Sequence, residues 1–238
     1  MRRLVAIHQP NFLPWLGYFD KLARADVFVI LDSVQFPRTS RGTWMNRVKL
    51  LVSGSPSWVT VPVVRAKTGV QQVREVEIDP TQRWREKLLR TIEVNYRRAA
   101  CFDESFPLVQ EVLAEPARNL ADFNEAGVRH LAEALGLDTR RLVRSSTLPP
   151  QSSGTDLLID LTLAAGGTTY LSGGGADGYQ QDERFAERGV ELLYQDFVQP
   201  TYPQIVAEPV RGLSVVDALL SCGTTGVRRL LGLEFASA

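Results

Sequence analysis

The sequence has little of several residue types on which common enzyme classes depend. It contains two histidines, two cysteines and two methionines in 238 residues. Cys101 and Cys222 lie too far apart for a zinc site or a redox motif, so we expect both to be reduced and packed as small apolar residues. No cluster with metal-ligand spacing is visible, and no Ser, His and Asp order typical of a hydrolase is recoverable. The sequence therefore predicts no metal site.

Long apolar runs and net charge are also missing. No run approaches the roughly 20 residues that span a bilayer, and the apolar run after Arg3 is too short for a signal peptide. The 27 basic and 27 acidic residues cancel, so any attraction to an anionic ligand must be local. No internal repeat is present. We expect a cytoplasmic protein without a membrane partner, and we expect residues 1–238 to form one domain.

The chain opens on the pattern of a βαβ unit. Residues 4–7 form an apolar run typical of a short buried strand, apolar residues recur at helical spacing between Gly17 and Asp26, and residues 27–31 form a second run. This order predicts two parallel neighbours in one sheet. Polar residues 8–11 then follow the carboxyl end of the first strand, which is where open α/β sheets bind ligands.

Helical patterns dominate the middle of the chain, and alternation returns after it. We expect Asp79 to cap the first middle helix, with Pro80 in its first turn. Strands that alternate with helices predict an α/β fold with a mostly parallel, Rossmann-like sheet, into which a helical lobe at about residues 80–136 is inserted. The other expected elements are strands at 57–63, 73–78, 141–144, 168–172 and 190–194, and helices at 156–165 and 182–188.

His8 is the first candidate catalytic residue, and Gln9 and Asn11 accompany it. A histidine with a near-neutral pKa at the end of a buried strand suits general-base work or hydrogen bonding to a ligand. The alternative is an imidazole that only bonds the backbone and holds the turn. The polar neighbours favour a functional role. His130 lies beside the apolar stripe of a helix, and we expect it to be structural.

Two further segments could bind an anionic or aromatic group. Gly17 begins a helix, where a ligand can approach the backbone and free N–H groups attract anions. From Arg38 to Lys49, basic residues alternate with Trp44 and polar residues, so arginine forks could clamp phosphates while an aromatic ring stacks on a base or sugar. The alternative is a solvated loop. The candidate binding residues here are Trp15, Gly17, Tyr18, Asp32, Arg38, Arg41, Asn46 and Arg47.

A glycine-rich segment follows the strand expected at 168–172, and it should reach the same sheet edge as His8. Consecutive glycines expose the backbone to a ligand and can form an anion-binding nest, although such turns are also common flexible connectors. A later polar-aromatic turn, at residues 197–204, is either a binding loop or a rigid proline loop. The candidates from both segments are Tyr170, Ser172, Gly173, Asp177, Tyr179, Tyr202 and Gln204.

Together these segments resemble the WbqC-like family of bacterial proteins. The resemblance covers nearly the whole chain, in order, and the opening motif is its specific part. The sequence departs from the family pattern where Asp156 and Leu157 replace a basic residue, and where Gln199 replaces a histidine before Pro200. Substrate or activity would differ here if those positions contact ligand. The segments that carry the resemblance are residues 8–19, 46–47, 58–62, 170–173, 202–204 and 213–217.

The resemblance implies a product of a surface-polysaccharide gene cluster. In such clusters the family's namesake is a proposed transferase that moves glycine or another acyl group to an amino sugar. We therefore expect an acyl or aminoacyl transferase that acts on an amine of an amino sugar or a natural-product intermediate. His8 would deprotonate the amine, and Gln9, Asn11 and Ser172 would orient the reactants. Arginines would hold the phosphates of the carrier, whether nucleotide, acyl-CoA or the acceptor end of aminoacyl-tRNA.

A second similarity keeps two alternatives open. The segment Trp15-Leu16-Gly17-Tyr18 occupies the place of the His-x-Gly-His motif of nucleotidyltransferases and class I aminoacyl-tRNA synthetases, so the fold is expected to be HUP-like or nucleotidyltransferase-like. Both histidines are absent, which disfavours adenylation by the usual route. The alternatives are nucleotidyl transfer or ATP-dependent ligation on this scaffold, and binding of a nucleotide sugar or scaffolding without turnover.

Overall fold

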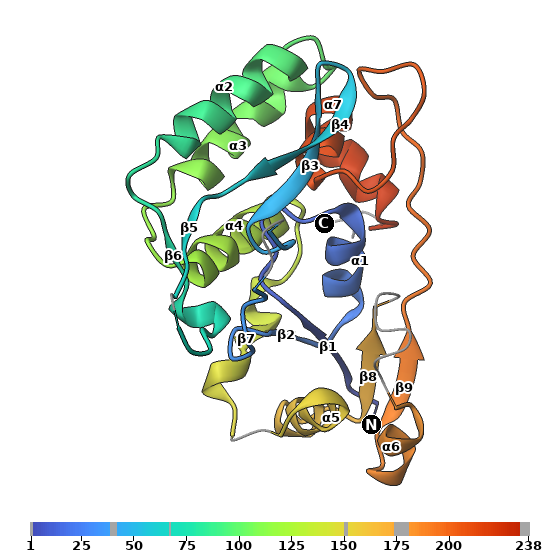
Figure 1. Ribbon diagram of the computed structural model, residues 1–238. Helices are drawn as coiled ribbons and strands as arrows, with labels where there is room; N and C mark the ends of the chain where they lie inside the picture. Colours follow the sequence, from blue (N-terminus) through green and yellow to red (C-terminus); the bar gives the residue numbers. More distant parts are fainter. Residues whose placement is uncertain (1, 39–41, 67, 150–151, 174–180, 234–238) are drawn as a thin grey trace.

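A computed structural model describes residues 2–38, 42–66, 68–149, 152–173 and 181–233. Its centre is a five-stranded parallel sheet in the order β7-β2-β1-β8-β9 (Figure 1). Renumbered in chain order, the strands run 3-2-1-4-5 across the sheet, which is the order of doubly wound dinucleotide-binding folds. The strands are β1 (Leu4–His8), β2 (Val27–Ile30), β7 (Leu142–Arg144), β8 (Thr169–Ser172) and β9 (Glu191–Tyr194).

The sheet separates two apolar cores, as the side-chain alternation in β1 requires. Ala6 faces the larger core, whereas Val5 and Ile7 face the smaller one. The larger core contains residues of α1 (Leu16–Arg24), α2 (Trp84–Tyr96), α3 (Phe102–Ala114), α4 (Leu120–Ala134) and α7 (Val215–Leu230). The smaller core lies between the sheet and the helices α5 (Gly154–Ala164) and α6 (Glu183–Glu187). These two helices are at the lower end of Figure 1. These layers confirm the Rossmann-like α/β fold.

The opening βαβ unit and the helical insertion are confirmed. β1 and β2 pair in parallel, with Val5 opposite Val27, and α1 connects them. Helices α2–α4 are inserted between β2 and β7. The same insertion holds an antiparallel hairpin of β3 (Arg47–Val52) and β4 (Ser55–Thr60), and a short pair of β5 (Val63–Val64) and β6 (Glu77–Ile78). The sequence patterns above predict neither β3 nor α7.

Three predicted elements differ in the structure, two of them because of local side-chain hydrogen bonds. The strand expected at 57–63 is divided between β4 and β5. The strand expected at 73–78 is a 3₁₀ turn, η1 (Val73–Glu75), followed by β6, because Gln72 and Glu75 form a reciprocal capping box. Capping residues of this kind compete with extended structure.

The helix expected to begin at Pro80, with Asp79 as its cap, starts four residues later, at Trp84. The Asp79 carboxylate instead accepts hydrogen bonds from the backbone N–H and hydroxyl of Thr81, at 2.9 and 2.7 Å, and from the Gln82 amide. These bonds form a local Asx turn and also lower the pKa of Asp79. In the part of the chain that the structure describes, no helix is long and apolar enough to cross a membrane.

Candidate active site at the carboxyl edge of the sheet

The strand order reverses direction between β1 and β8, and parallel α/β sheets bind ligands in the crevice that opens there. A cavity of about 530 Å³ lies at this point. Its lining includes both His8, the last residue of β1, and Gly173, which follows the last residue of β8. The opening motif and the start of the glycine-rich segment therefore meet, as the sequence predicts. This switch-point cavity is lined by His8, Asn11, Trp15, Gly17, Tyr18, Trp44, Gly173, Gln195 and Gly212.

The side chain of Asn124 holds the opening motif against the turn before β3. The Asn124 amide of α4 donates to the carbonyl of Pro10 at 2.8 Å and to that of Met45 at 2.6 Å. The backbone N–H of Phe12 donates to the carbonyl of Trp44 at 2.9 Å. The loop after β1 and the turn before β3 are thereby fixed against each other. This arrangement places Trp44 on the rim of the cavity.

The start of α7 holds the other end of the opening motif. The Ser214 hydroxyl donates to the carbonyl of Leu13 at 2.8 Å. Leu13 has a φ of 40°, a left-handed conformation that costs free energy in a residue with a Cβ atom. Gln199, where the resemblance implies a histidine, accepts a 2.9 Å hydrogen bond from the backbone N–H of Gly212, a residue of the cavity lining. Its side chain thus supports the cavity wall.

His8 is half-buried, and its environment keeps the ring neutral. Its Nδ1 lies 3.1 Å from the carbonyl oxygen of Gln9, which assigns the proton to Nδ1 and leaves Nε2 as an acceptor. The ring packs edge-on against Tyr18 with 4.8 Å between centroids. Burial, helped by the nearby Lys21 cation, lowers the pKa of His8 to about 3. The near-neutral pKa expected from the sequence is wrong for this reason.

Lys21 is a buried cation beneath the same edge of the sheet, and sequence reasoning missed it. Its side chain is 2% exposed, and Nζ donates to the carbonyl of Ile7 at 2.9 Å. A Cβ atom on Gly173 would lie 3.8 Å from Nζ, so the amine is close to the cavity wall. Burial lowers the pKa of Lys21 to about 7. One feature of the sequence could have indicated that Lys21 lies near the cavity. Lys21 comes four residues after Gly17, so both residues lie on one face of α1.

Two buried polar atoms of the cavity lining have no hydrogen-bond partner among the described residues: Oδ1 of Asn11 and the hydroxyl of Tyr18. Their residues are 4% and 1% exposed. An unsatisfied buried polar group costs about 1–3 kcal/mol, so such groups are normally paired with water or ligand. Burial raises the pKa of the Tyr18 phenol, which therefore stays protonated. The cavity offers a ligand one amide oxygen and one hydroxyl donor.

Gly17 has a different role from the one expected. A Cβ atom at this position would lie 2.3 Å from Cη2 of Trp15, so the indole of Trp15 rests directly on the Gly17 backbone. The close approach that only glycine permits is made by Trp15. Gln195 completes this wall, because its amide donates to the Gly17 carbonyl at 2.8 Å and to the Asp20 carboxylate at 2.7 Å.

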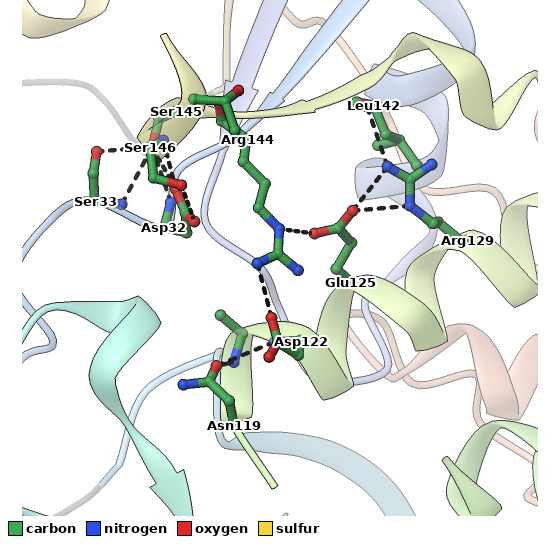
Figure 2. A network of polar contacts seen from close by, with 12 residues as sticks. Asp32, Ser33, Asn119, Asp122, Glu125, Arg129, Leu142, Arg144, Ser145 and Ser146 are labelled. Atoms are coloured by element: carbon green, nitrogen blue, oxygen red, sulfur yellow. Dashed lines mark hydrogen bonds and ion pairs between the residues drawn. The ribbon is translucent and has the colours of Figure 1, made fainter. Parts of the chain in front are cut away.

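Ser172 and Asp32 lie at the carboxyl edge of the sheet, and Tyr170 lies within β8 in the smaller core; none of these side chains lines the switch-point cavity. Ser172 is fully buried and hydrogen-bonds Tyr170, whose ring stacks on Phe185 at 5.4 Å. Asp32 ties the end of β2 to the end of β7, because its carboxylate accepts from the hydroxyls of Ser145 and Ser146 (Figure 2).

A charged network connects α4 to β7. Figure 2 shows Glu125 of α4 between two arginines, and its carboxylate forms ion pairs with Arg129, at 2.8 Å, and with Arg144. Arg144 also reaches Asp122, at 2.8 Å. Glu125 contributes to the raised pKa of Tyr18. The ion pairs in Figure 2 link the helical insertion to β7 and hold the Glu125 carboxylate in place.

Tyr202 and Gln204 are directed to another part of the molecule. Both donate to the buried carboxylate of Asp217 in α7, at 2.7 and 3.0 Å, and Tyr96 donates to the same carboxylate at 2.8 Å. Burial raises the pKa of Asp217. These residues join α2, α7 and the segment before α7, and they do not line the switch-point cavity.

The described side chains of the basic segment between Arg38 and Lys49 have different partners and do not form one cluster. Arg38 donates to the carbonyl of Gly69, and Asn46 accepts from the Thr43 N–H at 2.9 Å within its own turn. The Arg47 guanidinium instead lies over the ring of Trp58, 4.0 Å from its centroid. Three candidates lie outside the described residues: Arg41, Asp177 and Tyr179.

A larger groove of about 880 Å³ runs between β4 and the start of α2. Of its three cations, Arg83 and Arg90 are exposed and paired with Glu86 and Glu93, and Lys87 is also exposed. No polar atom of its lining is buried without a partner among the residues described. The switch-point cavity is smaller, but it has the buried polar groups that fix a ligand's orientation. Within the described ranges, no three His, Cys, Asp or Glu side chains are placed to hold a metal ion.

Comparison with known proteins agrees with this architecture at the level of the family. The chain matches the WbqC-like protein family over residues 9–229. It is 32% identical over 221 residues to the uncharacterized protein Rv1507c of Mycobacterium tuberculosis, which covers 92% of this chain and 94% of that protein. No solved structure matches the chain. From its opening motif to the end of α7, the chain belongs to the WbqC-like protein family.

Proposed function

We propose that the chain is a cytoplasmic transferase that moves an acyl or aminoacyl group from an activated carrier to an amine. One observation carries the proposal: His8, Asn11 and Tyr18 line one cavity at the switch point of a Rossmann-like sheet, the imidazole is neutral, and the Asn11 amide oxygen and the Tyr18 hydroxyl have no partner among the described residues. Acyl transfer to an amine needs an acceptor for the amine proton and a donor for the developing oxyanion. The three groups supply both.

In this proposal His8 binds the attacking amine through a hydrogen bond. Its Nε2 accepts a hydrogen bond from the amine N–H while the nitrogen attacks the carbonyl carbon of the donor. A C–N bond forms, the carbonyl oxygen becomes an oxyanion, and the amine proton passes to His8. A group with a pKa of about 3 is a weak base, so His8 takes the proton only once the new C–N bond has made the nitrogen strongly acidic, and it then passes that proton to the departing carrier. The bond between the carbonyl carbon and the carrier then breaks.

Tyr18 and Asn11 position the reactants. The Tyr18 hydroxyl stays protonated because burial raises its pKa, so it can donate to the oxyanion. The Oδ1 atom of Asn11 accepts from an N–H of the amine or of an aminoacyl group. Gln9 follows the end of β1 and Ser172 ends β8, so both belong to the same sheet edge. The acceptor in this proposal is an amino sugar or a natural-product amine.

The test is an amide-forming assay read by mass spectrometry. The donors are acetyl-CoA, glycyl-tRNA and glycine with ATP and Mg²⁺, and the acceptors are glucosamine and a nucleotide-linked amino sugar. We expect an amide with one donor class, and a rate lowered about 100-fold or more in His8→Asn. His130→Asn is the matched control, because His130 lies on the exposed side of α4 beside Glu111. Equal rates in all three proteins would refute the role of His8.

The sheet order also favours a second candidate, nucleotidyl transfer or ATP-dependent ligation, because doubly wound sheets with this order bind nucleotides at the switch point. ATP-dependent exchange of pyrophosphate separates this activity from transfer of a preformed acyl group. Binding of a nucleotide-linked sugar in calorimetry, without product from any donor, would instead identify a binding protein.

A further inference from the structure

Two exposed tryptophans lie side by side next to the switch-point cavity. Trp44 and Trp58 are 43% and 39% exposed, and their ring centroids are 5.0 Å apart in an edge-on arrangement. Trp44 also lines the cavity, so the aromatic surface continues into it. Exposed large aromatic rings of this kind are typical of binding surfaces. A planar ligand group could stack here while its other end enters the cavity.

Two cations share this surface without a counter-ion. The Arg47 guanidinium lies 4.0 Å from the Trp58 centroid, and Nζ of Lys49 lies 5.1 Å from it. Neither side chain forms an ion pair with any described residue, and Nε of Arg47 is buried without a hydrogen-bond partner among them. A guanidinium stacked on an indole keeps its in-plane N–H groups for an anion. We call Trp44, Trp58, Arg47 and Lys49 the tryptophan–cation face.

The surrounding sequence has one sign of charge. Between Asp32 and Glu75 the chain has seven basic residues and no acidic residue, although the whole chain is neutral. The hairpin that carries the tryptophan–cation face is therefore a locally positive surface. Aromatic rings combined with unpaired cations favour a ligand that has both a planar ring and phosphates.

We propose that the tryptophan–cation face binds the adenine nucleotide of the activated donor, with the base stacked on Trp44 or Trp58 and a phosphate held by Arg47 and Lys49. This inference rests on the proposed function, because acyl-CoA, an acyl adenylate and aminoacyl-tRNA share an adenosine beside phosphate. Trp44 lies on the cavity rim, so the acyl group extends from this face toward His8 and Tyr18.

The test is binding by isothermal titration calorimetry, without acceptor and without turnover. The probes are coenzyme A, ATP and a short RNA hairpin with a single-stranded CCA end, which distinguish the three sources of the nucleotide. We expect the wild type to bind at least one probe, and Trp44→Leu or Trp58→Leu to weaken that binding about tenfold, as loss of a stacked base does. Lys49→Gln should weaken binding and reduce its dependence on salt.

Lys87→Gln is the matched control, because Lys87 is an exposed cation on α2 that lies in the other groove. Its binding should equal that of the wild type. The inference is overturned if no probe binds to the wild type, or if both tryptophan variants bind as the wild type does. Amide formation that survives in such variants would leave the proposed function intact. Tryptophan-dependent binding in a protein that forms no amide would support this site and refute the transferase.

Discussion

The ammonium group of Lys21 donates a 2.9 Å hydrogen bond to the carbonyl of Ile7, the residue directly before His8. A cation from α1 is thereby fixed beneath the carboxyl end of β1. Its field contributes to the lowered pKa of His8. The two side chains form one electrostatic unit, in which His8 is neutral and Lys21 titrates near neutral pH.

His8 should make the protein less stable in acid. Its pKa is about 3 in the folded protein and 6.5 in the unfolded chain, so between these values the unfolded chain binds a proton that the folded protein does not. This contribution lowers the free energy of unfolding as pH falls from 6.5 to 3, and it is absent above 6.5. Urea unfolding of His8→Asn should show a weaker loss of stability in this range. His130→Asn should follow the wild type, and parallel curves for all three would contradict the assignment.

Lys21 should make the stability of the protein increase as pH rises above neutral. Its pKa is about 7 when folded and 10.5 when unfolded, so the unfolded chain holds the extra proton between these values. Burial of the charge destabilises the wild type fully below about pH 7, and stability recovers as pH rises toward 10.5. Lys21→Met should lack this rise in chemical denaturation. A rise of equal size in the variant would show that another group causes it.

Gly17→Ala should displace the indole of Trp15. The new methyl group would lie 2.3 Å from that ring, and overpacking of this kind costs about 1–3 kcal/mol. In a Trp15→Leu background the same substitution should cost much less, because the opposing ring is gone. A double-mutant cycle measured by urea unfolding checks this coupling. Additive costs would mean that Trp15 does not rest on Gly17.

Asp217→Asn should destabilise the protein more than Tyr202→Phe. The carboxylate accepts hydrogen bonds from Tyr96, Tyr202 and Gln204, so its replacement weakens three bonds to a charged group, worth roughly 1.5–3 kcal/mol each at most. Tyr202→Phe removes one of them. Denaturation midpoints order the two variants, and equal midpoints would contradict a central role for the carboxylate.

The parallel sheet could be predicted because its strands are short apolar runs between helical patterns. The runs at 4–7 and 27–31 needed no information beyond hydrophobicity and order. The failures at 73–78 and at Asp79 have a local cause, since side-chain capping there outcompetes the expected strand and helix start. The pattern of hydrophobic residues does not predict such hydrogen bonds.

The candidate site was predictable in part. His8, Asn11 and Gly173 share a cavity because strand ends at one sheet edge converge. Tyr202 and Gln204 could not be placed, since their partner Asp217 lies on a helix that the sequence patterns did not predict. Lys21 was missed because a lysine in a short amphipathic helix is normally exposed, and only the packing of α1 under β1 buries it.

The most direct test of the account is to fill the switch-point cavity from Gly173. A Cβ atom here would lie 3.8 Å from Nζ of Lys21 and 4.0 Å from Oε1 of Gln195, and the backbone is not left-handed, so Gly173→Ala should fold as the wild type does. Gly173→Val and Gly173→Leu extend the side chain further from the same position. Each larger side chain should occupy more of the cavity, and the rate of amide formation should fall in that order while the melting temperature stays constant. Wild-type rates in a folded Gly173→Leu variant would show that the chemistry does not take place in this cavity.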